Sequence, residues 1–176
     1  AGARAHLLAP GPAVRRYRPA IIDYVLRAEV RAVSIDIVDA DGRTVRTLTA
    51  PTSTRAGAYR VRWNLRTHGA VTFPGMILRS ANPARGPLAP PGTYRVRLTV
   101  DGQVQERALA VERDPRLADV SDADLIEQYS LARRISDRTS DANRLVIGVR
   151  EMKARIATSL APAPQGSRVR SLAAAL

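Results

Sequence analysis

The hydrophobic and polar positions of this chain follow two rhythms that meet near residue 115. Before this point, short runs rich in Val, Ile, Thr and Tyr alternate with turn signals about every ten residues, a spacing typical of antiparallel sandwiches. In the run 33–39 the apolar residues fall at every second position, so Val33, Ile35 and Ile37 share one face. This two-residue period predicts β-strands with one buried face.

The same pattern continues along the first two thirds of the chain. The further predicted strands are 44–48, 58–65, 76–78, 94–100 and 103–111. The pairs Asp41-Gly42 and Asp101-Gly102 predict tight hairpin turns, because glycine adopts positive φ without a steric cost. Trp63 lies on the apolar face of its strand, and we expect its ring at the centre of the core.

The second rhythm is helical. Ser121 is a good N-cap, and acidic residues follow it in the first turn, where the helix dipole favours negative charge. From Leu125 to Leu160 apolar or small residues recur about every 3.5 positions, as in a coiled-coil stripe. A helix of about 35 residues would be about 50 Å long, so part of its stripe must pack on something other than the sandwich. A loop at 161–166 and a new start at Ser167 predict a truncated helical hairpin.

Three segments result from this pattern. Residues 1–19 show no periodicity and are interpreted as a linker or as the exit from a preceding domain; residues 20–114 form the sandwich; residues 115–176 form the helical tail. The chain begins without Met and ends in mid-pattern, so we expect it to be an internal piece of a longer protein. It shows neither a signal-peptide pattern nor a run of about 20 apolar residues that would span a bilayer.

The net charge of +12 is weaker evidence for a nucleic-acid partner than its size suggests. Of the 28 basic residues only Lys153 is a lysine, and no run of basic residues exceeds two. Because the charges are dispersed and no nucleic-acid-binding motif is present, nucleic acid is not expected as a partner. The absence of cysteine excludes disulfides and thiolate metal sites.

The acidic turn near residue 40 resembles a calcium loop only in part. Asp39, Asp41 and Gly42 fit its third, fifth and sixth positions. Ile37 and Leu48 would then stand at the first and twelfth positions, where neither side chain can bind a cation. A hairpin turn is therefore the favoured interpretation.

Catalytic and cofactor sites are not expected. His6 and His68 are the only histidines, and neither has His, Asp or Glu at ligand spacing, so no zinc site or serine triad is predicted. Asp36 and the turn acids have arginine neighbours that would keep them ionised, and nothing indicates a cleft between paired carboxylates. We therefore expect no catalytic residue, no metal and no cofactor in this chain.

The irregular stretch 66–86 holds the only residues that we nominate for contact with a ligand or another domain. They are His68, Arg79, Asn82 and Arg85. Long loops carry function more often than strands do, but the prolines of this stretch favour a connector packed against another domain.

Several segments together resemble known bacterial proteins. The stretch 39–48, with Trp63-Asn64 and Pro91-Gly92-Thr93-Tyr94, resembles the immunoglobulin-like domain of the flagellar hook-capping type. The segments FPGMIL and GPLAPPGTY, and Asp114-Pro115-Arg116 before a long helix, resemble the C-terminal region of sortilin-like β-propeller proteins, which are commonly labelled BNR-repeat glycosyl hydrolases. This resemblance covers roughly residues 15–160.

The resemblance implies an immunoglobulin-like sandwich with a helical tail, a propeller upstream in the same polypeptide, and a secreted or periplasmic location. No propeller blade and no Asp-box repeat occurs in this sequence, so no catalytic residue of the family can be carried onto it. The leading hypothesis is a non-catalytic accessory module that packs on the propeller or self-associates through its helix. The alternative is a module that binds carbohydrate or cell-envelope material through exposed aromatic residues.

Overall fold

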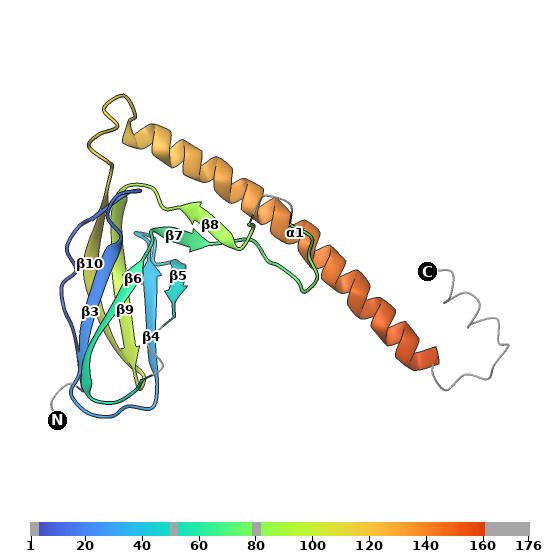
Figure 1. The fold of residues 1–176 in the computed structure, drawn as a ribbon, viewed down its shortest axis with the longest axis horizontal. Helices are drawn as coiled ribbons and strands as arrows, with labels where there is room; N and C mark the ends of the chain where they lie inside the picture. The colour runs from blue at the N-terminus through green and yellow to red at the C-terminus, as the bar shows by residue number, and fades with distance from the viewer. Residues whose placement is uncertain (1–3, 50–52, 79–81, 161–176) are drawn as a thin grey trace.

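The computed structural model describes residues 4–49, 53–78 and 82–160 and shows a two-layer β-sandwich from which one long helix projects (Figure 1). One layer has the strand order β1 (Ala5–Leu7), β3 (Ala20–Leu26), β6 (Gly57–Trp63). The other has the order β2 (Ala13–Val14), β10 (Gln103–Glu112), β9 (Gly92–Val100), β4 (Val33–Val38), β5 (Thr44–Leu48). The predicted β-sandwich followed by a long helix is thereby confirmed.

The strand order is that of an immunoglobulin-like sandwich. In chain order, β3, β4, β5, β6, β9 and β10 occupy the places of strands B, C, C′, E, F and G of that fold. Adjacent strands pair antiparallel, except that β2 runs parallel to β10. Tyr94, at the start of β9, donates its hydroxyl to Pro90 O at 3.0 Å, which is the tyrosine-corner hydrogen bond of such sandwiches.

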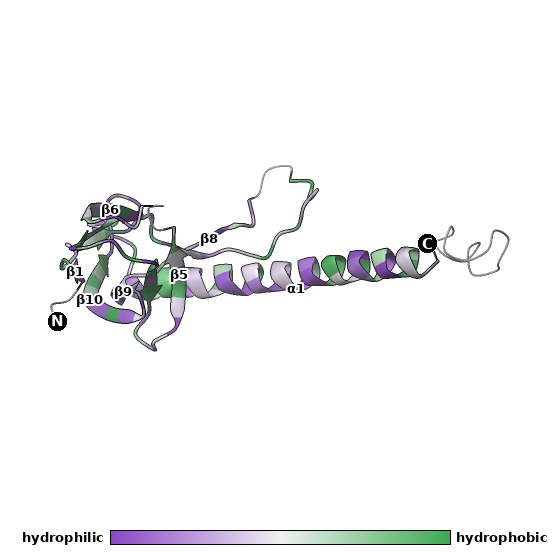
Figure 2. Cartoon of the chain, turned by 90° about the horizontal axis from the view of Figure 1, so that it is seen from below, coloured by the Kyte–Doolittle hydropathy of each residue, from purple (hydrophilic) through white to green (hydrophobic). Residues whose placement is uncertain are grey.

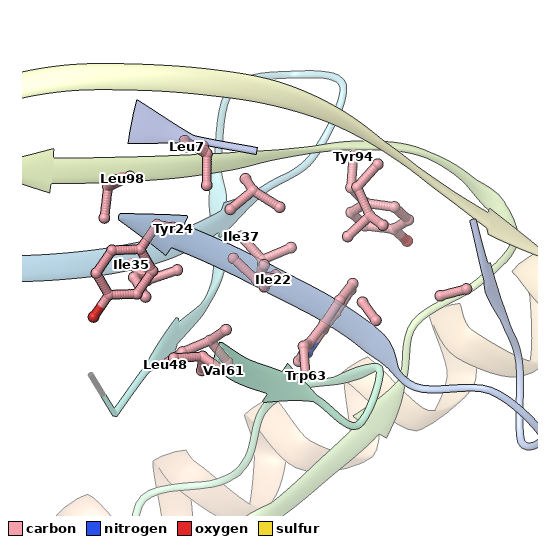
Figure 3. Close-up of a cluster of buried hydrophobic side chains, with 14 of the residues drawn as sticks. Leu7, Ile22, Tyr24, Ile35, Ile37, Leu48, Val61, Trp63, Tyr94 and Leu98 are labelled. Atoms are coloured by element: carbon pink, nitrogen blue, oxygen red, sulfur yellow. The ribbon is translucent and has the colours of Figure 1, made fainter. Parts of the chain in front are cut away.

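Alternating side chains of the two layers form the core between them (Figure 3). Trp63 is 0% exposed, as predicted, and its indole N–H donates to Arg66 O at 2.8 Å. Its ring packs edge-on against Tyr94, with 5.5 Å between centroids. The period of two therefore produced the expected buried face in β4, β6 and β9, whereas β3 was not predicted as a strand.

Residues 1–19, interpreted from the sequence as a linker, contribute two strands to the sandwich. Ala5 and Leu7 of β1 and Ala13 of β2 are buried in the core. The Gln105 amide fixes β1 by accepting from Leu7 N at 2.9 Å and donating to Ala5 O at 2.7 Å. Strands of three and two residues are too short for periodicity to reveal them.

The stretch 66–86, expected to be irregular except for a strand at 76–78, also differs from the prediction. Residues 76–78 form no strand, and Ile77 is 87% exposed. Instead β7 (Arg66–His68) and β8 (Arg85–Leu88) pair in a separate two-stranded sheet; residues 66–88, as far as they are described, are called the arm below. Their pairing needs a residue without a side chain, because a Cβ on Gly86 would meet Thr67 O at 2.0 Å.

The helix α1 (Asp122–Leu160) is continuous over 39 residues, as the second rhythm predicted. Its start is a capping box: Ser121 Oγ accepts from Asp124 N at 3.1 Å, and the Asp124 carboxylate accepts from Ser121 N at 2.8 Å. The second arm of the predicted helical hairpin, beyond residue 160, lies outside the described residues. Within the described ranges, no helix has the length and apolar content that crossing a bilayer requires.

Candidate functional site: the helix and the arm

The arm lies along the helix (Figure 1) and contacts it through polar groups. Asn143 Nδ2 donates to Val71 O at 2.6 Å, and Val71 N donates to Ser140 Oγ at 3.1 Å. Ser140 and Asn143 are buried in this contact. One turn of the helix therefore satisfies both backbone groups of Val71, which the arm cannot pair with a strand.

Two arginines of the helix extend this contact in both directions. Arg133 Nη1 donates to His68 O at 2.9 Å. Arg150 Nη1 donates to Pro74 O at 2.8 Å, and its guanidinium lies 4.5 Å from the centroid of the Phe73 ring. Two carbonyl groups of the arm, those of His68 and Pro74, thus accept hydrogen bonds from cations of the helix.

The side of the helix that hydrogen-bonds to the arm is polar, whereas the side turned away from these bonds is apolar and exposed. Seven apolar side chains, each between 38% and 72% exposed, form this surface, which we call the open face. They are Leu131, Ile135, Leu145, Val146, Val149, Met152 and Ile156. At about 100° per residue, Val149 and Ile156 point well away from Asn143. Figure 2 shows hydrophobic stretches along the part of α1 that extends beyond the sandwich.

The four residues nominated from the sequence have different positions. His68 and Arg85 pair across β7 and β8, and Asn82 Oδ1 accepts from Ala84 N at 3.1 Å within the turn before β8. Arg79 lies outside the described residues. Burial lowers the pKa of His68, and Arg46 and Arg133 lower it further, so its imidazole is neutral at pH 7. The helix contacts the backbone of His68.

Asn82 and Arg85 line a groove of about 490 Å³ between the arm and the helix. Most of its walls are apolar: Met76, Ile77, Leu78, Pro83 and Pro87 from the arm, and Ala132 and Ile135 from the helix. Through Ile135 the groove is continuous with the open face. The sequence nominated Asn82 and Arg85 for contact with a ligand or another domain; in the structure the element that faces them across the groove is the helix of the same chain.

A second hollow, of about 530 Å³, lies where the sandwich, the arm and the helix meet. It contains Arg15, Arg16, Arg66 and Arg85, together with Asn64, Gln128 and Tyr129. Sequence reasoning missed the first three arginines, because residues 15 and 66 are far apart in the chain and nothing in their spacing brings them together. The pair Arg15-Arg16 was the one available signal.

Aromatic residues are not displayed on the surface in the way that glycan-binding modules display them. Trp63, Tyr24 and Tyr94 are buried in the core. Tyr59 stacks on Tyr24 at 5.3 Å between centroids, and the exposed Tyr17 ring is covered by the Arg116 guanidinium at 4.6 Å. Among the described residues, no group of three His, Cys, Asp or Glu side chains could hold a metal ion.

Comparisons with known proteins give this chain no family. No family model matches its sequence, and no curated protein matches it. Among solved structures, the crystal structure of CopC from Methylosinus trichosporium OB3b aligns with a TM-score of 0.35 and 16% sequence identity, covering 64% of this chain and 98% of that one.

Proposed function

We propose that this chain is a non-catalytic interaction module, in which a rigid sandwich holds out a long helix whose open face pairs with another apolar helix. The single observation that carries the proposal is the division of the helix into two sides. The polar side is occupied by the arm, and the apolar side is left exposed. A helix built only to cover its own domain would turn its apolar side inward.

The spacing on the open face supports a helical partner. Ile135, Ala142, Val149 and Ile156 recur every seven residues, and Leu145 and Met152 flank them at the same interval. A seven-residue repeat is the seam of a coiled coil, since it keeps the same side chains facing a partner helix. In the isolated chain, the partner available to this seam is the helix of a second copy.

Hydrophobic burial supplies the driving force for such pairing. Fully burying a Val, Leu, Ile or Met side chain contributes about 1.5–3 kcal/mol. The seven side chains of the open face are at least 38% exposed, so each gains burial in a dimer. An exposed apolar stripe of this extent is uncommon on a monomer and marks an interaction surface.

The experiment is sedimentation of the isolated chain with two matched helix variants. The wild-type chain is expected to form a dimer at micromolar concentration. Val149→Glu places a charge in the seam and is expected to weaken dimerisation at least 100-fold. Ala154→Glu adds the same charge on another side of the same helical segment, and Ala154 is exposed, so the dimer is expected to persist. A wild-type chain that stays monomeric with the helix ordered, or equal effects of both variants, would refute the proposal.

The wider setting follows from the resemblance to sortilin-like β-propeller proteins. In that setting the module packs on an upstream propeller of an exported protein, and the helix presents its seam beyond the sandwich. The reading frame upstream of residue 1 is then expected to encode repeated propeller blades with Asp-box motifs. A different upstream domain would refute the propeller part of the proposal, but it would not affect the proposed pairing of the helix.

A further inference from the structure

The hollow between sandwich, arm and helix gathers positive charge without a counter-charge. Arg15, Arg16, Arg66 and Arg85 all line it. Within the described ranges none of the four forms an ion pair, although ten ion pairs occur elsewhere in the same ranges. Four guanidinium groups around one hollow repel one another and so destabilise the folded state. The need to fold therefore does not explain why they are gathered there.

Arg15 is the least usual of the four because it is buried, with 4% of its surface exposed. Its Nε donates to Ala89 O at 3.2 Å and its Nη2 donates to Gln128 Oε1 at 2.7 Å. Both acceptors are neutral, so the guanidinium is oriented by the protein but its charge is not balanced. Burial lowers the pKa of Arg15, and the charges of Arg16 and Arg66 lower it further. Charged side chains are rarely buried without a partner.

The other groups around the hollow are also held in place. Arg66 Nη1 donates to Gly86 O at 2.8 Å, and burial and Arg85 lower its pKa. Asn64 Oδ1 accepts from Arg66 N at 3.1 Å, which leaves the Asn64 amide N–H groups as donors to a ligand. Arg16 has φ of +67°, a conformation that costs a non-glycine residue about 1 kcal/mol or more and that recurs at ligand sites.

From these observations we propose that the hollow binds a small molecule carrying a phosphate or sulfate group. Arginine forks match tetrahedral oxyanions in geometry and charge. Four uncompensated cations need more than the single charge of one carboxylate. The volume of about 530 Å³ falls in the range of small-molecule sites, so it accommodates an organic portion beside the oxyanion. The site is separate from the open face and does not depend on the proposed pairing of the helix.

The test is calorimetric titration of the full 176-residue chain with inorganic phosphate, inorganic sulfate and phenyl phosphate, in chloride buffer of constant ionic strength. Saturable binding at one site per chain is expected, with phenyl phosphate binding more tightly than the inorganic ions. Arg85→Gln removes one exposed cation of the hollow. Arg16→Gly removes another while keeping the backbone conformation, because glycine adopts positive φ freely. Each variant is expected to weaken binding about tenfold, the effect of one charge-assisted hydrogen bond.

The matched control is Arg62→Gln, which removes the same charge from an exposed residue of β6 that does not line the hollow. Its affinity is expected to equal that of the wild-type chain. An equal loss in Arg62→Gln would show that the ions only screen the net charge, and would overturn the proposal. Absence of saturable binding by all three probes would also overturn it, as would binding of a glutamate-rich peptide in preference to phenyl phosphate.

Discussion

At the scale of single residues, two buried tyrosines of the core differ in what their hydroxyls contact. The Tyr94 hydroxyl donates to Pro90 O, whereas the buried Tyr24 hydroxyl has no hydrogen-bond partner among the described residues. Burial raises the pKa of both phenols. Burying a hydroxyl without a hydrogen bond destabilises the folded state, whereas a hydrogen bond offsets the cost of its desolvation.

The same substitution at these two positions is therefore expected to have opposite effects. Tyr24→Phe should raise the free energy of unfolding by about 1 kcal/mol, because it removes an unpaired polar atom and keeps the ring stack on Tyr59. Tyr94→Phe should lower it by about 1–2 kcal/mol, because Pro90 O loses its donor. Urea unfolding followed by tryptophan fluorescence measures both. A destabilised Tyr24→Phe would show that its hydroxyl is hydrogen-bonded in solution.

The close approach at Gly86 gives a second prediction at this scale. A methyl group there would overlap Thr67 O and force β7 and β8 apart, so Gly86→Ala should destabilise the chain by about 1–3 kcal/mol. Gly11→Ala is the control, since a Cβ at Gly11 meets nothing within 4 Å. Thermal unfolding of the two variants distinguishes them, and equal melting temperatures would show that the arm accommodates the methyl group.

At the scale of elements, the junction between β10 and α1 holds two ion pairs, Arg113–Asp122 and the shorter Arg116–Asp114. The Asp114 carboxylate accepts from Arg116 Nη2 at 2.6 Å, from its Nε at 2.9 Å and from its backbone N at 3.0 Å. Arg116 also covers Tyr17, so the turn before β3 is linked to the start of the helix. The side-chain bond from Arg116 is the main reason that the pKa of Asp114 falls to about 2.

This pKa gives the junction an acid sensitivity. Because the folded pKa lies below the unfolded value of about 3.9, the stabilisation is fully present above pH 4 and is lost as the pH falls toward 2. Asp114→Asn has no carboxylate at this position, so it lacks this stabilisation and has none to lose on acidification. The unfolding free energy of the variant should therefore fall less steeply between pH 4 and pH 2 than that of the wild-type chain. Parallel curves for the two proteins over this interval would contradict the assignment.

Most elements were predictable from the sequence where a run showed its period. The strands around Ile35, Tyr59, Val96 and Leu109, and the helix after Ser121, are of this kind. The seven-residue strand β3 was missed, because Ile21 and Val25 on its less buried face are also apolar and hide the alternation. The short strands at 5–7 and 13–14 were missed because their pairing depends on partners far along the chain. The arm was missed for the same reason, since β7 and β8 pair through glycines whose role is visible only once the strands meet.

At the scale of the whole molecule, the helix is longer than the domain that holds it. Thirty-nine residues make a rod of about 58 Å, whereas the ten residues of β10 extend about 34 Å. The sequence predicted this excess length and the exposed stripe that goes with it. It could not predict the hollow between sandwich, arm and helix, because the residues around that hollow come from three segments that are far apart in the sequence.

This shape can be measured on a variant that does not pair. A globular chain of 176 residues would have a radius of gyration of about 16 Å. The Val149→Glu monomer should exceed this value clearly in small-angle X-ray scattering, because the last turns of the helix project away from the sandwich. A radius near 16 Å would show that the helix folds back onto the domain.

The parallel pairing of β2 with β10 has a mechanical consequence. The strand β10 leads toward the helix through the Asp114 junction, and it is bonded on both flanks, to β9 and to β2. A pull on the C-terminal end of β10 that follows the direction of the strand acts across hydrogen bonds that run sideways to it. Such bonds share the load and must rupture together in shear, whereas bonds at a peeling end break one after another. The sandwich is therefore shaped to resist a pull along β10.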